Sequence, residues 1–487
     1  MEIDQASLYS KLPQVGEFLD SMRGRELLRR HPRVLVVEAA REVLSNLRHA
    51  IGNGVLTEPS LTGEIEQLPE RVAAALQDRE RKGVRPVINA TGVILQTNLG
   101  RAPLSEDAID HIAAVARGYC SLEFDLETGE RGRRGAHVEA LLIRMLGCDS
   151  AQSASLVVNN CAAATFLALN SVAAGGEVIV SRGELVEIGG GFRVPDILRK
   201  SGARLVEVGT TNRTRVEDYA AAVTEETRLI LRVHRSNFQI VGFTYQPELR
   251  ELVEFGADKG IPVMVDQGTG CVESLAEYGL GQQSSFLESA RSGAALVCAS
   301  GDKLLGGPQC GLIAGDRTIV GKLRSNPLYR ALRVDKLTLA ALEATILAYL
   351  SDRADTIPVI RMLGLSAEAI RTRCEAWARE LALNAVEASV TPTASVVGGG
   401  TTPGATLASF AIALRVRGLN ADQLAALLRR MDPPVIARIH EGRVLLDLRT
   451  VPESMDQAAL SALRAGLLTH AAGVTAEDQS GRADTSQ

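Results

Sequence analysis

Residues 298–311, CASGDKLLGGPQCG, decide how the rest of the chain is interpreted. They overlap an apolar run, ALVCAS at 295–300, that predicts a buried strand. The glycines and proline at 306–308 then exclude a helix. Lys303 therefore follows a strand in a stiff turn, whereas a lysine that serves only solubility would normally lie on a helix surface. Alone it could still be a surface-loop lysine, but its setting suggests that it is presented to a ligand.

The chain around this stretch alternates between short β-branched runs and segments of helical length. Two of the helical segments lie at 162–176 and 246–260. The alternation predicts an α/β fold with a mostly parallel sheet. The expected strands are ASLVVN (154–159), EVIVSR (177–182), ARLVEVG (203–209), TRLILRVH (227–234), PVMVDQG (262–268) and ALVCAS (295–300).

Four parts are expected along the chain. Apolar residues at helical spacing predict a small helical N-terminal domain with its linker over 1–80, and the α/β alternation fills a large domain over 81–345. Mixed helices and strands predict a smaller α+β domain over 346–473, in which the Gly-, Thr- and Pro-rich segment 391–406 is expected to be a loop. Residues 474–487 carry few apolar side chains and are expected to be a disordered tail.

The bulk composition excludes several classes of protein. A net charge of about −5 argues against a protein that coats nucleic acid non-specifically, although a local basic face stays possible. The seven cysteines form no CxxC pair, which favours a reducing cytoplasm over disulfides or a zinc site, and we expect no metal. No secretory signal and no apolar run of membrane-spanning length are present, so we expect a cytoplasmic protein without a membrane partner.

Asp266 ends the strand at 262–268, as Lys303 follows the strand at 295–300. Ligands of open α/β sheets bind beyond the carboxyl ends of strands. A lysine there can form a Schiff base with pyridoxal 5′-phosphate, and an aspartate can pair with the pyridine nitrogen. Asp266 alone could be a turn-forming residue. The pair in this order predicts a pyridoxal phosphate enzyme.

Other strand ends supply candidate contacts to this cofactor. Asn159, Asn160 and Cys161 are expected at the N-terminus of a helix, where their backbone N–H groups could bind the cofactor phosphate. The Ser300 hydroxyl could bind the same phosphate. His234 and Ser236, with Asn237, could touch the ring, and Arg182 and Glu184 could lie over it. Each of these side chains could instead be an ordinary cap, turn or loop residue.

Three arginines are candidates for binding an anionic co-substrate. Arg330 and Arg333 would share one face if NPLYRALRVDK (326–336) is helical, and Arg101 follows a glycine turn. Guanidinium groups bind phosphate-like anions through paired N–H donors, although a solvated charged face is the alternative. Arg131, Arg133 and Arg134 lie in a loop that could meet a phosphate backbone or a neighbouring subunit.

Together these motifs resemble the bacterial selenocysteine synthases, the L-seryl-tRNA(Sec) selenium transferases. The resemblance covers most of the chain, and the segments at 300–313 and 328–338 are its most specific parts. It is carried by NATGVILQTNLGRAPLS (89–105), LVVNNCAAA (156–164), SRGELVEIGGGFRVPDIL (181–198), VHRSNFQIVGF (233–243), VDQGTG (265–270), SGDKLLGGPQCGLI (300–313) and LYRALRVDKLT (328–338).

The resemblance implies a fold-type I pyridoxal phosphate transferase that converts L-seryl-tRNA(Sec) to L-selenocysteinyl-tRNA(Sec) with selenophosphate, through an external aldimine and a dehydroalanyl intermediate. It implies that Lys303 forms the Schiff base, that Asp302 is a catalytic acid and that Arg101, Arg330 and Arg333 bind the anion. It further implies that the N-terminal helices grip the tRNA and that the chain forms a ring-shaped homodecamer with active sites between subunits.

Two positions depart from the family pattern. Cys161 stands where a third asparagine is common, and Gln96 stands where a histidine is frequent, which leaves a proton-transfer role there in doubt. A small-molecule lyase, aldolase or aminotransferase of the same fold is the main alternative. A tRNA-binding protein with a vestigial pocket is a second alternative, and the intact Lys303, Asp266 and Asp302 argue against it.

Overall fold

The computed structural model describes residues 5–80, 83–189, 191–281, 284–383 and 385–483. Its internal contacts divide the chain into two compact units, Met1–Pro86 and Val87–Gln487. We describe each unit by itself. Within the described residues, no helix combines the length and apolar character that a membrane crossing requires.

The first unit is a helical bundle built around α4. Its central helix buries Val36, Leu44 and Ile51, spaced so that they share one face, and this face packs with Val72 and Leu76 of α6. The helices are α1 (Gln5–Ser10), α2 (Val15–Asp20), α3 (Met22–Arg30), α4 (Arg33–Gly52), α5 (Glu58–Glu66) and α6 (Leu68–Glu80). The expectation of a helical N-terminal region is confirmed.

The second unit contains a seven-stranded sheet, in the order β3-β11-β10-β9-β8-β4-β7. All six expected strands are present, and the sheet is parallel except for β11, which runs antiparallel to β10 and β3. The bounds are β3 (Ser153–Val158), β4 (Glu177–Ser181), β7 (Arg204–Val208), β8 (Thr227–Val233), β9 (Val263–Asp266), β10 (Leu296–Ser300) and β11 (Gly311–Asp316). The predicted mostly parallel α/β sheet is thus confirmed.

Helices cover both faces of this sheet, because successive strand residues point to opposite sides. In β3, Leu156 and Val158 join one hydrophobic cluster and Val157 joins another. The first face carries α9 (Cys161–Ala173), α10 (Val194–Lys200), α14 (Arg317–Ser325) and α15 (Pro327–Leu332). The second face carries α8 (Ala136–Leu146), α11 (Val216–Ala222), α12 (Leu249–Lys259), α13 (Phe286–Arg291) and α16 (Lys336–Leu350), and α7 (Glu106–Ala116) packs on α16. A short hairpin joins β5 (Glu187–Ile188) to β6 (Phe192–Arg193).

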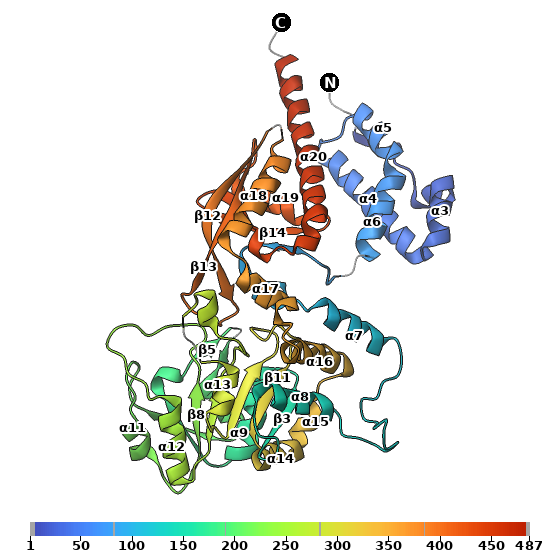
Figure 1. Cartoon of the computed structure of the whole chain (residues 1–487). Helices are drawn as coiled ribbons and strands as arrows, with labels where there is room; N and C mark the ends of the chain where they lie inside the picture. Colours follow the sequence, from blue (N-terminus) through green and yellow to red (C-terminus); the bar gives the residue numbers. More distant parts are fainter. Residues whose placement is uncertain (1–4, 81–82, 190, 282–283, 384, 484–487) are drawn as a thin grey trace. The chain divides into compact units, whose positions relative to one another are not determined.

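A six-stranded sheet, in the order β1-β14-β15-β13-β12-β2, forms the other layer of this unit. Figure 1 labels its long strands and the helices beside them. The strands are β1 (Ile88–Ala90), β2 (Val93–Leu95), β12 (Val386–Gly398), β13 (Thr406–Val416), β14 (Val435–His440) and β15 (Arg443–Asp447). The nearby helices are α17 (Pro358–Gly364), α18 (Ala367–Leu381), α19 (Ala421–Arg429) and α20 (Asp456–Ala483).

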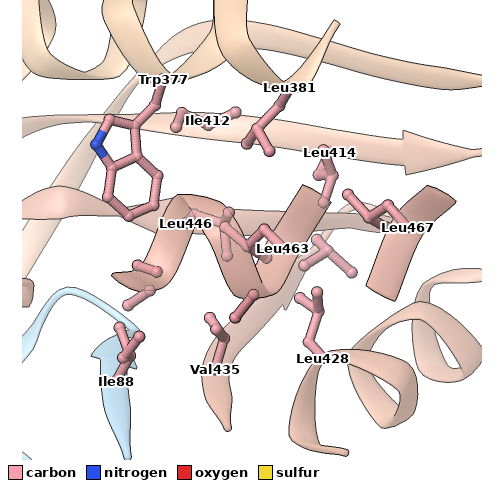
Figure 2. Close-up of a cluster of buried hydrophobic side chains, with 14 of the residues drawn as sticks. Ile88, Trp377, Leu381, Ile412, Leu414, Leu428, Val435, Leu446, Leu463 and Leu467 are labelled. Atoms are coloured by element: carbon pink, nitrogen blue, oxygen red, sulfur yellow. The ribbon is translucent and has the colours of Figure 1, made fainter. Parts of the chain in front are cut away.

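A hydrophobic core joins this sheet to its helices. Figure 2 shows Trp377 and Leu381 of α18, with Leu463 of α20, against the sheet residues Ile412 and Leu446. All of these side chains are buried. The core fixes the sheet whose first strands lead directly into the segment that carries Arg101.

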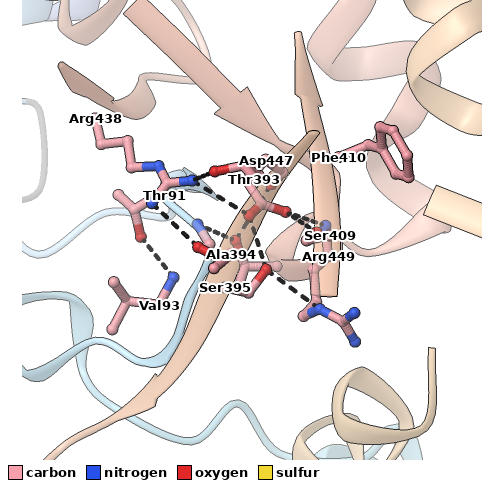
Figure 3. A network of polar contacts seen from close by, with 12 residues as sticks. Thr91, Val93, Thr393, Ala394, Ser395, Ser409, Phe410, Arg438, Asp447 and Arg449 are labelled. Carbon is pink, nitrogen blue, oxygen red and sulfur yellow. Dashed lines mark hydrogen bonds and ion pairs between the residues drawn. The ribbon is translucent and has the colours of Figure 1, made fainter. Parts of the chain in front are cut away.

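A buried polar network anchors that segment (Figure 3). The fully buried Asp447 carboxylate accepts hydrogen bonds from the hydroxyls of Ser395, at 2.7 Å, and Ser409, at 3.0 Å. Thr91 forms a β-bridge with Asp447, and the N–H of Gly92 donates to Thr450 at 3.1 Å. The connection between β1 and β2 is therefore tied to the C-terminal strands.

Three local expectations differ from the structure. The predicted loop 391–406 begins as strand, because β12 runs to Gly398 and pairs with both β13 and β2. β1 and β2 belong to the second sheet, so residues 81–345 are not all built around the first. The expected tail 474–487 continues α20 to Ala483, because extending an existing helix avoids a new nucleation step; residues 484–487 lie outside the described residues.

Candidate functional site

Lys303 lies in a tight turn that follows β10. The N–H of Gly301 donates to the carbonyl of Cys310, and the N–H of Leu304 donates to that of Thr269, each at 2.9 Å. A Cβ on Gly301 would meet the carbonyl oxygen of Pro308 at 2.6 Å, so a larger residue would displace the turn. The turn buries Lys303 to 6% exposure, which is unusual for a lysine.

The turn opens onto a cavity of about 240 Å³ at the carboxyl ends of β8, β9 and β10. Lys303 lines it together with most of the predicted site residues. These are Arg101, Asn160, Cys161, His234, Ser236, Asp266, Ser300 and Asp302. Side chains from segments far apart in sequence therefore meet where an open α/β sheet binds its ligands.

Asp266 is buried at the end of β9 and is held by two residues of α9. The Thr165 hydroxyl donates to Oδ2 at 3.2 Å, and the Cys161 thiol lies 3.7 Å from Oδ1. Burial raises the pKa of the Asp266 carboxyl, while the Thr165 hydroxyl and the Lys303 ammonium act against that rise. A buried carboxylate of this kind needs a cation to pair with.

Lys303, Asp302 and Arg101 form a charged group at the cavity. Arg101 Nη1 donates to Asp302 Oδ2 at 2.8 Å. The backbone of Arg101 has a left-handed φ of 63°, and its N–H closes a turn by donating to the carbonyl of Gln96. Burial lowers the pKa of Lys303, and the Arg101 guanidinium acts in the same direction. A lysine with a lowered pKa is more readily a neutral amine, which is the form that attacks a carbonyl.

His234 follows β8 and lines the same cavity. Its backbone N–H donates to the carbonyl of Asp266 at 2.9 Å, whereas its buried Nδ1 has no hydrogen-bond partner among the described residues. Burial lowers the pKa of His234 to about 4, with a contribution from Lys303. The imidazole is therefore neutral near pH 7.

The N-terminus of α9 also faces the cavity. Asn160 caps the helix by accepting from the N–H of Ala163 at 2.8 Å, and the next two residues, Cys161 and Ala162, line the cavity. The N–H of Asn159 instead donates to the carbonyl of Leu332 at 3.0 Å, and Asn159 does not line the cavity. The expected anion position at this helix end therefore loses one of its three predicted residues.

Several other predicted residues lie elsewhere. Arg182 pairs with Glu207 at 3.1 Å, and Glu184 is fully buried but does not line the cavity; its carboxylate accepts from the N–H of Val233 at 2.9 Å. α15 ends at Leu332, so Arg333 has an extended backbone and does not continue a helical face with the exposed Arg330. Neither of those two arginines lines the cavity of the single chain.

The remaining candidates are engaged with neighbouring side chains. Asn237 donates to the carbonyl of Glu187 at 2.8 Å. Arg131 and Arg134 both pair with Glu123, at 3.0 and 2.8 Å, and Arg133 pairs with the buried Glu139 at 3.3 Å. These arginines therefore stabilise their own loop in the isolated chain.

Sequence reasoning missed two residues of the site, of which only Gln309 lines the cavity. Gln309 lines the cavity beside the Lys303 turn, and Thr165 holds Asp266 from the middle of an apolar helix. Gln309 could have been found from its place in the glycine-rich turn. Thr165 gave no signal, because a threonine in AAATFLAL is indistinguishable from a core residue in the sequence.

The residues of this cavity fit pyridoxal phosphate. Lys303 supplies an amine of lowered pKa, Asp266 supplies a buried carboxylate, and His234 and Asp302 each have a buried polar atom without a partner in the described structure. The fold belongs to the fold-type I class of pyridoxal phosphate enzymes. The chain superposes on D-glucosaminate-6-phosphate ammonia-lyase with a TM-score of 0.55, at 22% identity, covering 80% of this chain and 97% of that one.

The sequence defines the family within that class. The family described as L-seryl-tRNA selenium transferase matches residues 87–452, and the one described as selenocysteine synthase N terminal matches residues 9–48. The L-seryl-tRNA(Sec) selenium transferase of Geobacter sulfurreducens is 45% identical, covering 94% of this chain and 99% of that protein. That of Aquifex aeolicus is 42% identical, covering 91% and 96%. The chain belongs to the L-seryl-tRNA(Sec) selenium transferase family.

This membership decides between the functions left open by the sequence. The protein is an enzyme, a selenocysteine synthase that converts seryl-tRNA(Sec) to selenocysteinyl-tRNA(Sec), and its cofactor is pyridoxal phosphate. A small-molecule lyase, aldolase or aminotransferase is not supported, because the ammonia-lyase named above shares only the fold with this chain.

Proposed function

We propose that Lys303 carries the cofactor and that Asp266 pairs with its ring nitrogen. The observation that carries this proposal is the shared cavity of Lys303 and Asp266 at neighbouring strand ends. Pyridoxal phosphate supplies an electron sink there, which eases loss of the seryl Cα proton and of the Cβ hydroxyl. The neutral imidazole of His234 would lie against the ring without adding charge.

The cofactor phosphate would be held at the start of α9. The N–H groups of Cys161 and Ala162 have no hydrogen-bond partner among the described residues, and the helix dipole favours an anion there. Ser300 and Ser236 add hydroxyls to the same cavity. Because backbone N–H groups do the binding, Cys161 can replace an asparagine in this role.

Lys303 Nζ would receive the Cα proton and later return it. Its burial favours the neutral amine that this transfer requires. Asp302 would orient Arg101 through their 2.8 Å ion pair, and Arg101 would present its remaining N–H groups to the selenium donor.

Arg330 and Arg333 would complete the anion site from a neighbouring subunit. Arg330 is exposed and Arg333 has a buried Nε without a partner among the described residues, which supports a role at a surface covered on assembly. We propose a homodecamer with active sites between subunits, working in the cytoplasm on seryl-tRNA(Sec) and selenophosphate.

The N-terminal unit would grip the tRNA. Its α3 carries the basic run RGRELLRR, and the family match at residues 9–48 includes this helix. We propose that the four parts of the chain, divided at residues 80, 345 and 473, have different roles. The second part would carry out the cofactor chemistry, and the α+β part would support the segment that carries Arg101.

Borohydride reduction of the reconstituted enzyme tests the placement of the cofactor. The reduction fixes a lysine-bound pyridoxal phosphate as a stable amine that peptide mass spectrometry can locate. We expect the modification on Lys303 and its loss in Lys303→Ala. Modification of another lysine, such as Lys322 or Lys336, would contradict the proposal.

A further inference from the structure

We propose that Thr165 is a positioning residue, which together with the Cys161 thiol holds the Asp266 carboxylate ionised and oriented toward a cationic ring nitrogen. This inference rests on the proposed role of Asp266 and extends it to α9. It concerns a contact between two buried side chains, with 4% exposure for Thr165 and 7% for Asp266.

The contact is directional. Thr165 and Cys161 are one turn apart on α9 and so share a face, and each reaches a different oxygen of Asp266, at 3.2 and 3.7 Å. A helical threonine usually bonds back to a carbonyl of its own helix. Thr345 of α16 does so, donating to Ala341 at 2.8 Å, whereas Thr165 donates across to β9.

The surroundings explain why Asp266 needs these donors. Cys298 of β10 lies in register with Asp266 and offers no charge, and His234, which follows β8, is neutral. Lys303 is the nearby cation, and burial raises the pKa of the Asp266 carboxyl. An ionised carboxylate in this position depends on hydrogen bonds to offset its lost hydration. The hydrogen bond from the Thr165 hydroxyl is shorter than the contact with the Cys161 thiol.

The test measures how tightly cofactor-free protein binds pyridoxal phosphate. Thr165→Val keeps the shape and removes the donor, so we expect the dissociation constant to rise roughly tenfold or more. The loss should be larger at about pH 6 than at about pH 8, because a less stabilised carboxylate takes up its proton at higher pH. Thr165→Ser should bind like the wild type, and Cys161→Ala should lose less because a thiol is a weak donor.

Two controls separate positioning from packing. Thr345→Val removes a buried hydroxyl that bonds within its own helix, and should leave binding unchanged. In an Asp266→Asn background, Thr165→Val should have no further effect on the dissociation constant. If Thr165→Val does not fold, Thr165→Ala is carried through the same series.

Equal binding by the wild type and Thr165→Val at both pH values would overturn the inference. So would an undiminished effect of Thr165→Val in the Asp266→Asn background, since it would indicate general packing. Failure of the proposed function looks different, because the wild type itself would then bind no cofactor at Lys303.

Discussion

One carboxylate oxygen of Asp302 accepts a hydrogen bond from Arg101, and the other is buried without a partner among the described residues. An unsatisfied buried oxygen is costly in a folded protein and marks a position at which a ligand can donate a hydrogen bond. At the scale of single residues, the site is thus a set of buried polar groups whose partners are incomplete in the single chain.

Arg101→Lys is expected to impair use of the anionic selenium donor. Lysine keeps the charge but loses the planar N–H fork that can hold Asp302 and an anion together. We expect kcat/KM for selenophosphate to fall about 10- to 100-fold, while pyridoxal phosphate still binds. Arg250→Lys, in an exposed pair with Glu254, is the matched control and should have no effect. Unchanged kinetics for Arg101→Lys would contradict the assignment.

His234 should make the cofactor-free protein sensitive to acid. Its pKa is about 4 in the folded chain and 6.5 for the free side chain, so folding favours the neutral form. The stabilisation is present above the unfolded pKa and is lost as pH falls through the folded pKa, an effect on the order of 3 kcal/mol. Urea unfolding at several pH values should show a weaker acid dependence for His234→Asn. Parallel pH curves for both proteins would disprove this.

At the scale of elements, the strand–turn units could be predicted and their pairing could not. The six expected strands are present because β-branched runs bounded by turns leave few alternatives. β11 was missed because it returns antiparallel directly after the Lys303 turn, without a helical crossover. The Thr- and Pro-containing half of β12 resembles a loop in the sequence, because it is stabilised by pairing with the next strand, β13, and with β2, which lies far earlier in the chain.

The site shows the same division. Lys303, Asp266 and His234 were found because each follows a strand, which fixes the edge of the sheet where it lies. The prediction that Arg330 and Arg333 share one helical face requires a helix through both residues, but α15 ends at Leu332, one residue before Arg333. The contact of Thr165 with Asp266 depends on which face of α9 packs against β9, and the local sequence does not show this.

The glycine turn after β10 should tolerate no side chain at Gly306. Its φ is 72°, and a Cβ there would collide with Ile357. We expect Gly306→Ala to destabilise the fold by about 1–3 kcal/mol and to weaken cofactor binding. Gly321→Ala, inside α14 with open space around it, should be neutral or stabilising. Urea unfolding measures both, and equal stabilities for the two variants would refute the strain at Gly306.

At the scale of the whole molecule, two compact units divide the chain at residue 86. Their separate cores explain how one unit can bind a partner while the other keeps its cavity. Removal of the N-terminal unit is therefore the most direct way to separate tRNA binding from the reaction at the cofactor.

Removal of residues 1–86 should separate tRNA use from cofactor binding. The remaining unit retains both sheets and the complete cavity, so we expect it to fold and to bind pyridoxal phosphate. Its KM for seryl-tRNA(Sec) should rise at least about tenfold if the basic helix α3 contributes phosphate contacts. Filter binding and steady-state kinetics check this, and wild-type kinetics for the truncated protein would exclude the tRNA role.

Mixing two inactive variants tests the shared active site. Lys303→Ala and Arg333→Ala damage different parts of one proposed site, so mixed oligomers should regain part of the activity if the two residues come from different subunits. Mixtures of Lys303→Ala with Asp302→Asn, whose residues are adjacent in one chain, serve as the control. Absence of any recovery with Arg333→Ala would contradict a site formed between subunits.

The central claim is that Lys303 performs pyridoxal phosphate chemistry on serine that is carried by tRNA. The most direct measurement follows the visible absorbance of the reconstituted enzyme on addition of seryl-tRNA(Sec) or of free serine, with selenocysteinyl-tRNA(Sec) formation measured after selenophosphate is added. We predict a spectral change and product with the charged tRNA only, and neither with Lys303→Ala. An equal response to free serine, or turnover by Lys303→Ala, would contradict the account.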